Sequence, residues 1–508
     1  MVSRFFDTKL FYRNRFTIPL LAFFIPLAVR VIPEILMGPY IVGFDTLGFY
    51  VPNTIIWHQG GLDLWSFLSI APLFYSLLTP IITGAPIALA LKVLSPVLLG
   101  LLGLSIYIYA RRGLSWSPLK SLAPALLGTL YFVALRLSWD MLRNELGLIF
   151  LFIALTLLIA SKAGLLRTYG LLSFAIMAVV LSHQLVSVIM LGIIAFTVIQ
   201  HLIRREYTNS VRLFVSALPA LAFFLLFYFG TVAPYGFQDY QGSSGSSLAT
   251  WLGFSSYSAM LISEAGFFLY CFLPLLPLAV IAVRRLGVFQ LRVWVLLTLM
   301  LCLIPFAFVS PFRWLIMLLY PLSFLCVEAL SLLKGKRLWK KNHGFSLRRL
   351  ALLYLVVSTV ILSTGYIFMP PEQPFYYFNS EHVNSFVYQI PSSMLQNTVS
   401  ISDCNDVARS LEWYVNNANS SSVLLTHRVF YGWALLKLTT DQVRTYEFDD
   451  PTASAAELSE DGHSIVYVIW WVNGQGWYDQ LRLPSSFEEV FQSGHMAIYR
   501  YNVSSLNV

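Results

Sequence analysis

The chain has 508 residues, of which 57% are hydrophobic and only 11% are charged. An ordinary soluble domain has roughly 25% charged residues, so this composition excludes a soluble globular protein and indicates a polytopic membrane protein. The net charge of +8 does not imply nucleic acid as a partner, because the Lys and Arg residues gather in short loops between apolar segments.

Hydropathy and the basic loops predict about eleven membrane spans, with the N-terminus in the cytoplasm. Two of them are expected as short spans that meet at 182–184, with one tilted helix as the alternative. The other spans are expected near residues 16–32, 85–110, 119–137, 146–160, 212–232, 265–283, 293–309, 314–333 and 350–369. The first lacks a small-residue cleavage site and is expected to be an anchor.

Two long segments are expected outside the membrane. The first, 34–83, has aromatic residues spaced as in helices that lie along the lipid headgroups. The second, 233–263, contains the Gly/Ser run 242–247, which has little to bury and is expected to act as a mobile lid. A short polar turn at 138–145 is expected on the same side.

The residues after Pro370 differ from the preceding part of the chain, because strand and helix patterns replace the apolar spans. Apolar runs at 423–426 and 465–470 predict buried strands, and 404–417 and 430–437 predict helices. We therefore expect a transmembrane domain at 1–369, a tether at 370–402 and an extracytoplasmic α/β domain at 403–508. Sequons at Asn419 and Asn502 are compatible with that side. The four cysteines have no metal-binding spacing and predict no disulfide framework.

Asp45 is the first candidate functional residue. It lies in 41–52, a segment too polar and too broken to span, so its carboxylate needs water, a metal or a substrate as partner. A helix cap or a turn residue is the alternative. The topology places the following polar residues on the same outer side: Glu34, Asp63, Asp140, Arg143, Asn144, Glu145, His183, Gln184, Asp239, Glu264 and Arg313. A transporter would be expected to hold some of these charges at mid-membrane.

This arrangement resembles the GT-C superfamily of membrane glycosyltransferases, which use polyprenyl-phosphate-linked sugars. The resemblance covers the whole chain. Gly43-Phe44-Asp45 is similar to the first acidic motif of oligosaccharyltransferase catalytic subunits, although Thr46 replaces the proline of that motif. Ile262-Ser263-Glu264 is weakly similar to the external-loop glutamate motif of the same family.

The chain also departs from oligosaccharyltransferases. Their acceptor signature Trp-Trp-Asp-Tyr-Gly would follow the first strand of the external domain, where 426–433 reads Thr-His-Arg-Val-Phe-Tyr-Gly-Trp. The partial match at 470–474 lies on a later strand and lacks the aspartate. The chain is therefore more similar to protein O-mannosyltransferases and lipid A aminoarabinose transferases. The sequence resembles archaeal sequences in its general character. This resemblance implies a dolichyl phosphate as the donor lipid and the plasma membrane as the location of the protein.

The resemblance implies transfer of a sugar to an acceptor hydroxyl of a protein, lipid or glycan. Asp45 is expected to be the general base or a ligand of a divalent cation, Mg²⁺ or Mn²⁺. The second acidic group or further metal ligands are expected among Asp140, Glu145 and Glu264, with salt bridges as the alternative for the first two. The candidates for the donor phosphate are Arg313 first, then Lys92, Arg143 and His183.

Three of these phosphate candidates could instead have a purely structural role. Lys92 could reach outward along the lipid, Arg143 could pair with Asp140 or Glu145, and His183 could cap a helix hairpin. Oligosaccharyltransferase-like transfer to protein is one alternative function. A lipid or solute transporter and a scaffold that presents the C-terminal domain are two others.

Overall fold

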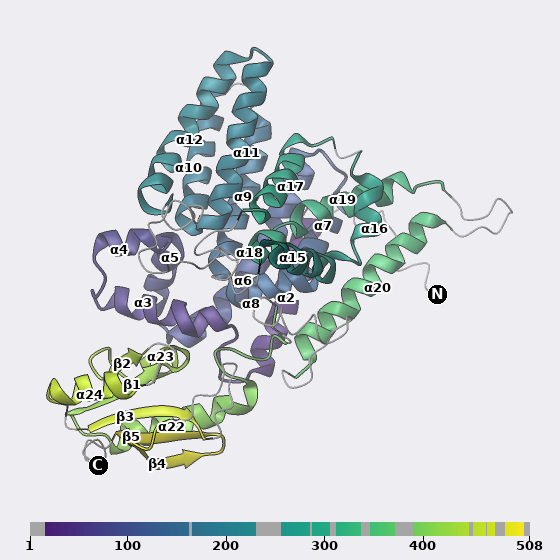
Figure 1. Ribbon diagram of the computed structural model, residues 1–508. Helices are drawn as coiled ribbons and strands as arrows, with labels where there is room; N and C mark the ends of the chain where they lie inside the picture. Colours follow the sequence, from purple (N-terminus) through teal and green to yellow (C-terminus); the bar gives the residue numbers. More distant parts are fainter. Residues whose placement is uncertain are drawn as a thin grey trace.

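The structure is a computed structural model with a helical part and a C-terminal sheet domain (Figure 1). It describes residues 16–161, 165–229, 256–284, 287–304, 311–336, 346–370, 390–391, 393–446, 451–463, 465–472 and 483–501. Several predicted features lie outside these ranges: the Gly/Ser run at 242–247, Asp239, the sequon at Asn502 and most of the tether at 370–402.

The helical part follows the predicted spans. Its elements are α2 (Thr17–Leu36), η2 (Thr46–Tyr50), α3 (Val51–His58), α4 (Leu64–Ser69), α5 (Pro72–Ile82), α6 (Ile87–Ile108), η3 (Tyr109–Gly113), α7 (Pro118–Leu130), α8 (Phe132–Asp140), α9 (Leu142–Ala160), α10 (Leu166–Ser182), α11 (Gln184–Ile203), α12 (Tyr207–Phe227), α15 (Tyr257–Phe272), α16 (Leu276–Ala282), α17 (Phe289–Cys302), α18 (Pro311–Ile316), α19 (Leu319–Leu332) and α20 (Leu347–Phe368).

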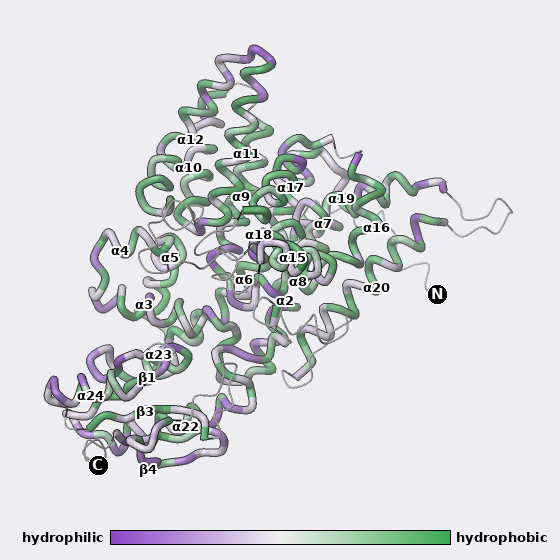
Figure 2. The backbone as a smooth tube through the Cα atoms, viewed as in Figure 1, coloured by the Kyte–Doolittle hydropathy of each residue, from purple (hydrophilic) through white to green (hydrophobic). Residues whose placement is uncertain are grey.

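Within the described residues, seven helices are long and apolar enough to cross a membrane, or nine if two bent pairs are counted as spans. The two remaining predicted spans correspond to the shorter apolar helices α10 and α17. Two helices, α10 and α11, occupy the stretch where one tilted helix was the alternative, and they meet at His183. Figure 2 shows hydrophobic colouring along these helices and hydrophilic colouring at the turn between α11 and α12.

The pair α7 and α8 corrects the prediction of a polar outer turn at 138–145. The chain bends by 58° at Tyr131, and α8 then continues to Asp140 with every residue buried. Only Met141 separates α8 from α9. The buried charges are tolerated because Arg136 pairs with Asp140 one turn away and Arg30 donates from Nε to the Ser138 carbonyl oxygen at 3.0 Å.

Helices α3, α4 and α5 form the segment expected along the headgroups. Trp57 of α3 stacks on Phe67 of α4, with ring centroids 3.6 Å apart. Asp63 caps α4 by accepting from the backbone N–H groups of Trp65 and Ser66. In Figure 1 these helices lie between the long helices and the sheet domain.

The C-terminal domain is a mixed five-stranded sheet with helices. Its strands have the order β2-β1-β3-β5-β4, with parallel pairing of β1 to β2 and β3, and antiparallel pairing around β5. The elements are α22 (Ile401–Asn417), β1 (Ser422–His427), α23 (Arg428–Leu435), β2 (Val443–Tyr446), α24 (Thr452–Glu460), β3 (Ile465–Trp471), β4 (Phe487–Ser493) and β5 (Met496–Tyr501). The sequence located β1, β3, α22 and α23, and it missed β2, α24 and the hairpin β4–β5.

Labelling of single cysteines tests the proposed orientation. The four native cysteines are buried, so they give little background. Glu460→Cys on α24 should react with a membrane-impermeant maleimide added to intact cells, whereas Thr208→Cys, at the start of α12, should react only after the membrane is permeabilised. Labelling of both from the same side would contradict the predicted topology.

Candidate active site

Asp45 directly precedes a turn of π-helix. The backbone N–H of Val51 donates to the Thr46 carbonyl oxygen, five residues back, and Pro52 has no N–H to continue an α-helical pattern. Single π-turns inside helices often occur at functional sites. Asp45 is half-buried, and among the described residues its carboxylate has no hydrogen bond or ion pair.

Gly43 brings this turn against α8. Its φ is +101°, a conformation that favours glycine, and a Cβ at this position would overlap the Trp139 carbonyl oxygen. The Cβ would also lie 2.6 Å from Thr46 Oγ1. Because Trp139 precedes Asp140, this close approach places the Asp45 turn beside the end of α8.

Asp140 differs from Asp45 in that it is already paired. It is buried and forms a salt bridge with Arg136, four residues earlier on α8. Asp140 also interacts electrostatically with Asp45 and with Arg313. The sequence raised a salt bridge between Asp140 and Arg143 as an alternative. That alternative is wrong, because Asp140 forms its salt bridge with Arg136 instead.

Arg143 lies in the first turn of α9. It donates from NH1 to the Ile70 carbonyl oxygen at 2.5 Å, and its guanidinium lies 5.7 Å from the Tyr50 ring centroid and 5.9 Å from that of Tyr75. It interacts electrostatically with Asp45, and its buried Nε has no hydrogen-bond partner among the described residues.

His183 caps α11, as one interpretation of the sequence had it. Its Nδ1 accepts from the Leu185 N–H at 3.1 Å. Burial, followed by the positive charges of Arg143 and Arg313, holds the pKa of His183 well below its usual range. The ring is therefore neutral near pH 7, and its proton is assigned to Nε2.

Arg313 lies on α18 and is half-buried. Among the described residues its guanidinium has no hydrogen bond or ion pair, although it interacts electrostatically with Asp140 and His183. The structure thus brings together five of the predicted site residues from distant parts of the chain: Asp45, Asp140, Arg143, His183 and Arg313.

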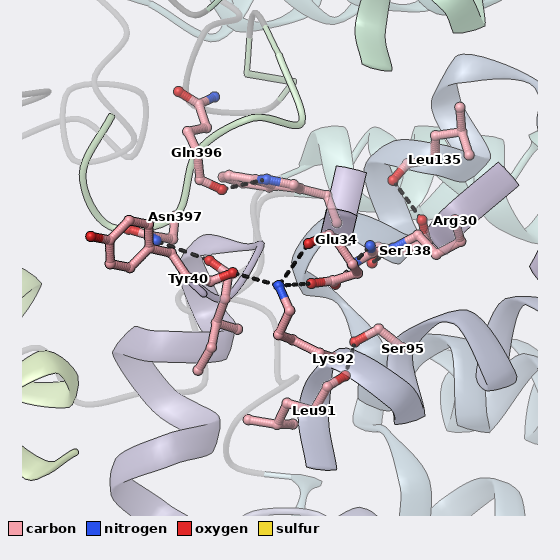
Figure 3. A network of polar contacts seen from close by, with 12 residues as sticks. Arg30, Glu34, Tyr40, Leu91, Lys92, Ser95, Leu135, Ser138, Gln396 and Asn397 are labelled. Carbon is pink, nitrogen blue, oxygen red and sulfur yellow. Dashed lines mark hydrogen bonds and ion pairs between the residues drawn. The ribbon is translucent and has the colours of Figure 1, made fainter. Parts of the chain in front are cut away.

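Lys92 lies outside this cluster. It donates from Nζ to the carbonyl oxygens of Glu34 and Tyr40, both at 2.8 Å, and pairs with the Glu34 carboxylate at 3.3 Å (Figure 3). Glu34 also pairs with Arg30. Lys92 therefore does not simply reach outward into the headgroups: it ties α6 to the end of α2 and to the segment that leads to Asp45.

Two of the predicted acidic residues are placed elsewhere. Glu145 is fully buried, has no hydrogen-bond partner for either carboxylate oxygen among the described residues, and interacts electrostatically with Arg30 and Tyr320. Glu264 lies on α15 and interacts with Cys302 of α17. Neither shows the electrostatic contact with Asp45 that Asp140 and Arg143 show.

The described residues include no group of three or more His, Cys, Asp or Glu side chains that could hold a metal ion. Asp45 and Asp140 supply two carboxylates, and Mg²⁺ usually keeps several waters beside one or two carboxylates and substrate phosphate. A cation here would take its other ligands from water, from the donor phosphate or from residues outside the described ranges.

Sequence reasoning missed two groups that shape the site. Arg136 was placed inside an apolar span, although a basic residue there is itself a signal of function. The segment 393–399, which we call the strap, was included in the tether. Its Gln396 carbonyl oxygen accepts from Trp139 Nε1 at 3.0 Å (Figure 3). The same oxygen also accepts from Gly43 N at 3.1 Å.

Comparison with known proteins gives the fold. No protein-family model matches the chain, and no curated protein sequence matches it. The structure is similar to the cryo-EM structure of the arabinofuranosyltransferase AftD from Mycobacteria, with a TM-score of 0.54, 13% identity, and coverage of 96% of this chain and 40% of AftD. The chain thus spans about two fifths of AftD.

It is also similar to the crystal structure of ArnT from Cupriavidus metallidurans bound to undecaprenyl phosphate. The TM-score is 0.51 at 12% identity, and the match covers 97% of this chain and 99% of ArnT. These two likenesses show the fold, so the predicted polytopic helical membrane fold with a C-terminal sheet domain is confirmed.

Replacement of Gly43 tests the close approach. Gly43→Ala should destabilise the protein by more than the roughly 1–2 kcal/mol expected for a non-glycine residue at positive φ, because its Cβ also overlaps Trp139. Gly38→Ala is the matched control, since Gly38 has a φ of +59° and open space around its Cβ position. Equal thermal unfolding midpoints for the two variants would contradict the contact.

Proposed function

We propose that the chain is a glycosyltransferase that moves a sugar from a polyprenyl-phosphate-linked donor to an acceptor hydroxyl on the outer face of the membrane. One observation carries the proposal. The fold gathers the Asp45 carboxylate, which has no ion pair among the described residues, and two cationic side chains, Arg143 and Arg313, around one end of α8. This is the set of groups that attack on an anomeric carbon and departure of a phosphate require.

Asp45 is the general base in this proposal. An acceptor hydroxyl has a pKa far above neutral, so a positioned carboxylate assists attack by accepting the proton as the new glycosidic bond forms. Asp140 is less suited to this role because it is engaged by Arg136. Asp140 instead holds Arg136 and leaves Asp45 as the carboxylate that is open to the acceptor.

The donor phosphate is the leaving group, and the cations meet its charge. As the bond between the anomeric carbon and the phosphate oxygen breaks, its electron pair stays on the lipid phosphate. Arg313 supplies the first charge-assisted hydrogen bonds, since its guanidinium is not engaged by another described residue. Arg143 adds a second positive charge, and neutral His183 donates from Nε2.

The nature of the donor lipid and of the membrane belongs to the same proposal. ArnT was solved bound to undecaprenyl phosphate, which supports a polyprenyl phosphate as the lipid partner. A dolichyl phosphate donor, the plasma membrane and an outward C-terminal domain follow from the sequence resemblance and the basic loops. A divalent cation would add to the neutralisation of the phosphate if the donor supplies part of its coordination shell.

Transfer of a monosaccharide is favoured over sequon recognition. The pair Trp470 and Trp471, which partly matches the oligosaccharyltransferase signature, is buried in the sheet domain. Trp471 donates from Nε1 to Asp403 at 3.0 Å. An indole that is buried and hydrogen-bonded within its own domain is not available to bind an acceptor peptide.

Replacement of the base tests the mechanism. Asp45→Asn should lower transfer from radiolabelled undecaprenyl-phosphate monosaccharides by about 10²- to 10⁴-fold, because the amide cannot accept the proton of the acceptor. The control is Asp63→Asn, the same substitution on the same outer side, where the aspartate only caps α4. Near-normal transfer by Asp45→Asn would show that another group is the base.

Replacement of Arg313 separates binding from proton transfer. Arg313→Ala should weaken binding of undecaprenyl phosphate by about 1.5–3 kcal/mol, roughly 10- to 150-fold, through loss of a hydrogen bond to a charged group. Arg111→Ala is the control, since Arg111 is exposed after α6 at the opposite end of that helix from Lys92. Equal affinities for the two variants would contradict the role of Arg313.

A further inference from the structure

The strap joins both acidic segments of the proposed site. Through one carbonyl oxygen, Gln396 accepts from Gly43, two residues before Asp45, and from Trp139, one residue before Asp140. Asn397 donates from Nδ2 to the Ile41 carbonyl oxygen at 2.9 Å, while its Oδ1 accepts from Val399 N at 3.0 Å. The strap thus holds the backbone on the N-terminal side of Asp45.

Helix α23 holds the backbone on the other side. A Cβ at Gly432 would overlap the Leu47 carbonyl group, so the main chains of α23 and η2 are in direct contact there. Arg428 stacks on Phe49 of η2, with its guanidinium 4.2 Å from the ring centroid. Only a glycine allows this approach, which is two residues after Asp45.

The strap and α23 are themselves connected. Trp433 donates from Nε1 to Thr398 Oγ1 at 3.1 Å, and its ring lies 5.7 Å from that of Tyr40. Trp433 and Thr398 are both buried, as are their neighbours Gly432 and Asn397. The strap and the C-terminal domain therefore contact the Asp45 turn at two points that are joined to each other.

We propose that Gly432 and Asn397 are positioning residues, through which the C-terminal domain and the strap bound to it set the place of Asp45 relative to Asp140. Neither residue touches the substrate in this account. The inference rests on the proposed role of Asp45 as the base, and it makes the sheet domain a part of the catalytic centre. A displacement of about 1 Å in a catalytic group can lower a rate by about 10²-fold.

The test compares Gly432→Ala and Asn397→Leu with the control Gly170→Ala, whose Cβ would meet nothing within 4 Å on α10. Both test variants should lower kcat by about 10- to 100-fold with the donor KM changed less than about twofold, since the phosphate-binding cations lie on other elements. Transfer is measured from each member of a panel of radiolabelled undecaprenyl-phosphate monosaccharides. The assay uses membranes that carry the native acceptors.

Hydrogen exchange gives a readout that does not depend on activity. The amides of 41–50 should exchange faster in both test variants than in Gly170→Ala, because the bond from Gly43 to Gln396 loses its support. The inference is overturned if exchange is unchanged, if kcat stays within about twofold of the control, or if kcat, donor binding and the unfolding midpoint all fall together.

The proposed function and the positioning role fail separately. Absence of sugar transfer by the unsubstituted protein would refute the proposed function, and full activity of Asp45→Asn would refute the role of Asp45 as the base, whatever the exchange of 41–50. Loss of activity in Asp45→Asn together with normal kcat in Gly432→Ala and Asn397→Leu would refute only the positioning role.

Discussion

The main chain at Gly43 lies against the Trp139 carbonyl only because this residue has no Cβ. That contact sets two segments side by side, the turn that carries Asp45 and the helix end that carries Asp140. The other features support it: Lys92 fixes the carbonyl of Tyr40 upstream, and Pro52 ends the π-turn downstream. The proposed site is therefore built by close backbone packing, and its side chains depend on that packing.

Electrostatics then gives the two carboxylates different roles. Asp140 is buried at the end of α8, a helix in which every residue is buried. Its charge is stabilised there by the salt bridge to Arg136, one turn earlier. Asp45 sits at the boundary with the C-terminal domain, half-buried and unpaired among the described residues. The nearby cations Arg143 and Arg313 come from helices α9 and α18, which the hydrophobic packing of the helical part holds in place.

The sequence predicted the parts of the structure that hydropathy and charge control. Each expected span has a matching helix or bent pair, and Asp45, Asp140, Arg143, His183 and Arg313 converge although they are far apart in the chain. The salt bridge between Arg136 and Asp140 could have been read from their four-residue spacing once α8 was extended to Asp140. The sequence could not show that Glu145 would lie near Arg30, which is far from it in the chain. The contact between Gln396 and Gly43 depends on tertiary packing that leaves no local pattern.

The central claim is that the cluster around the end of α8 binds the donor phosphate beside the base. The most direct measurement is a cryo-EM structure of the protein in lipid nanodiscs with undecaprenyl phosphate. The account predicts density for the phosphate within hydrogen-bond distance of the Arg313 guanidinium, on the side that faces Asp45. Phosphate density at a site that contacts neither Arg313 nor Arg143 would contradict it.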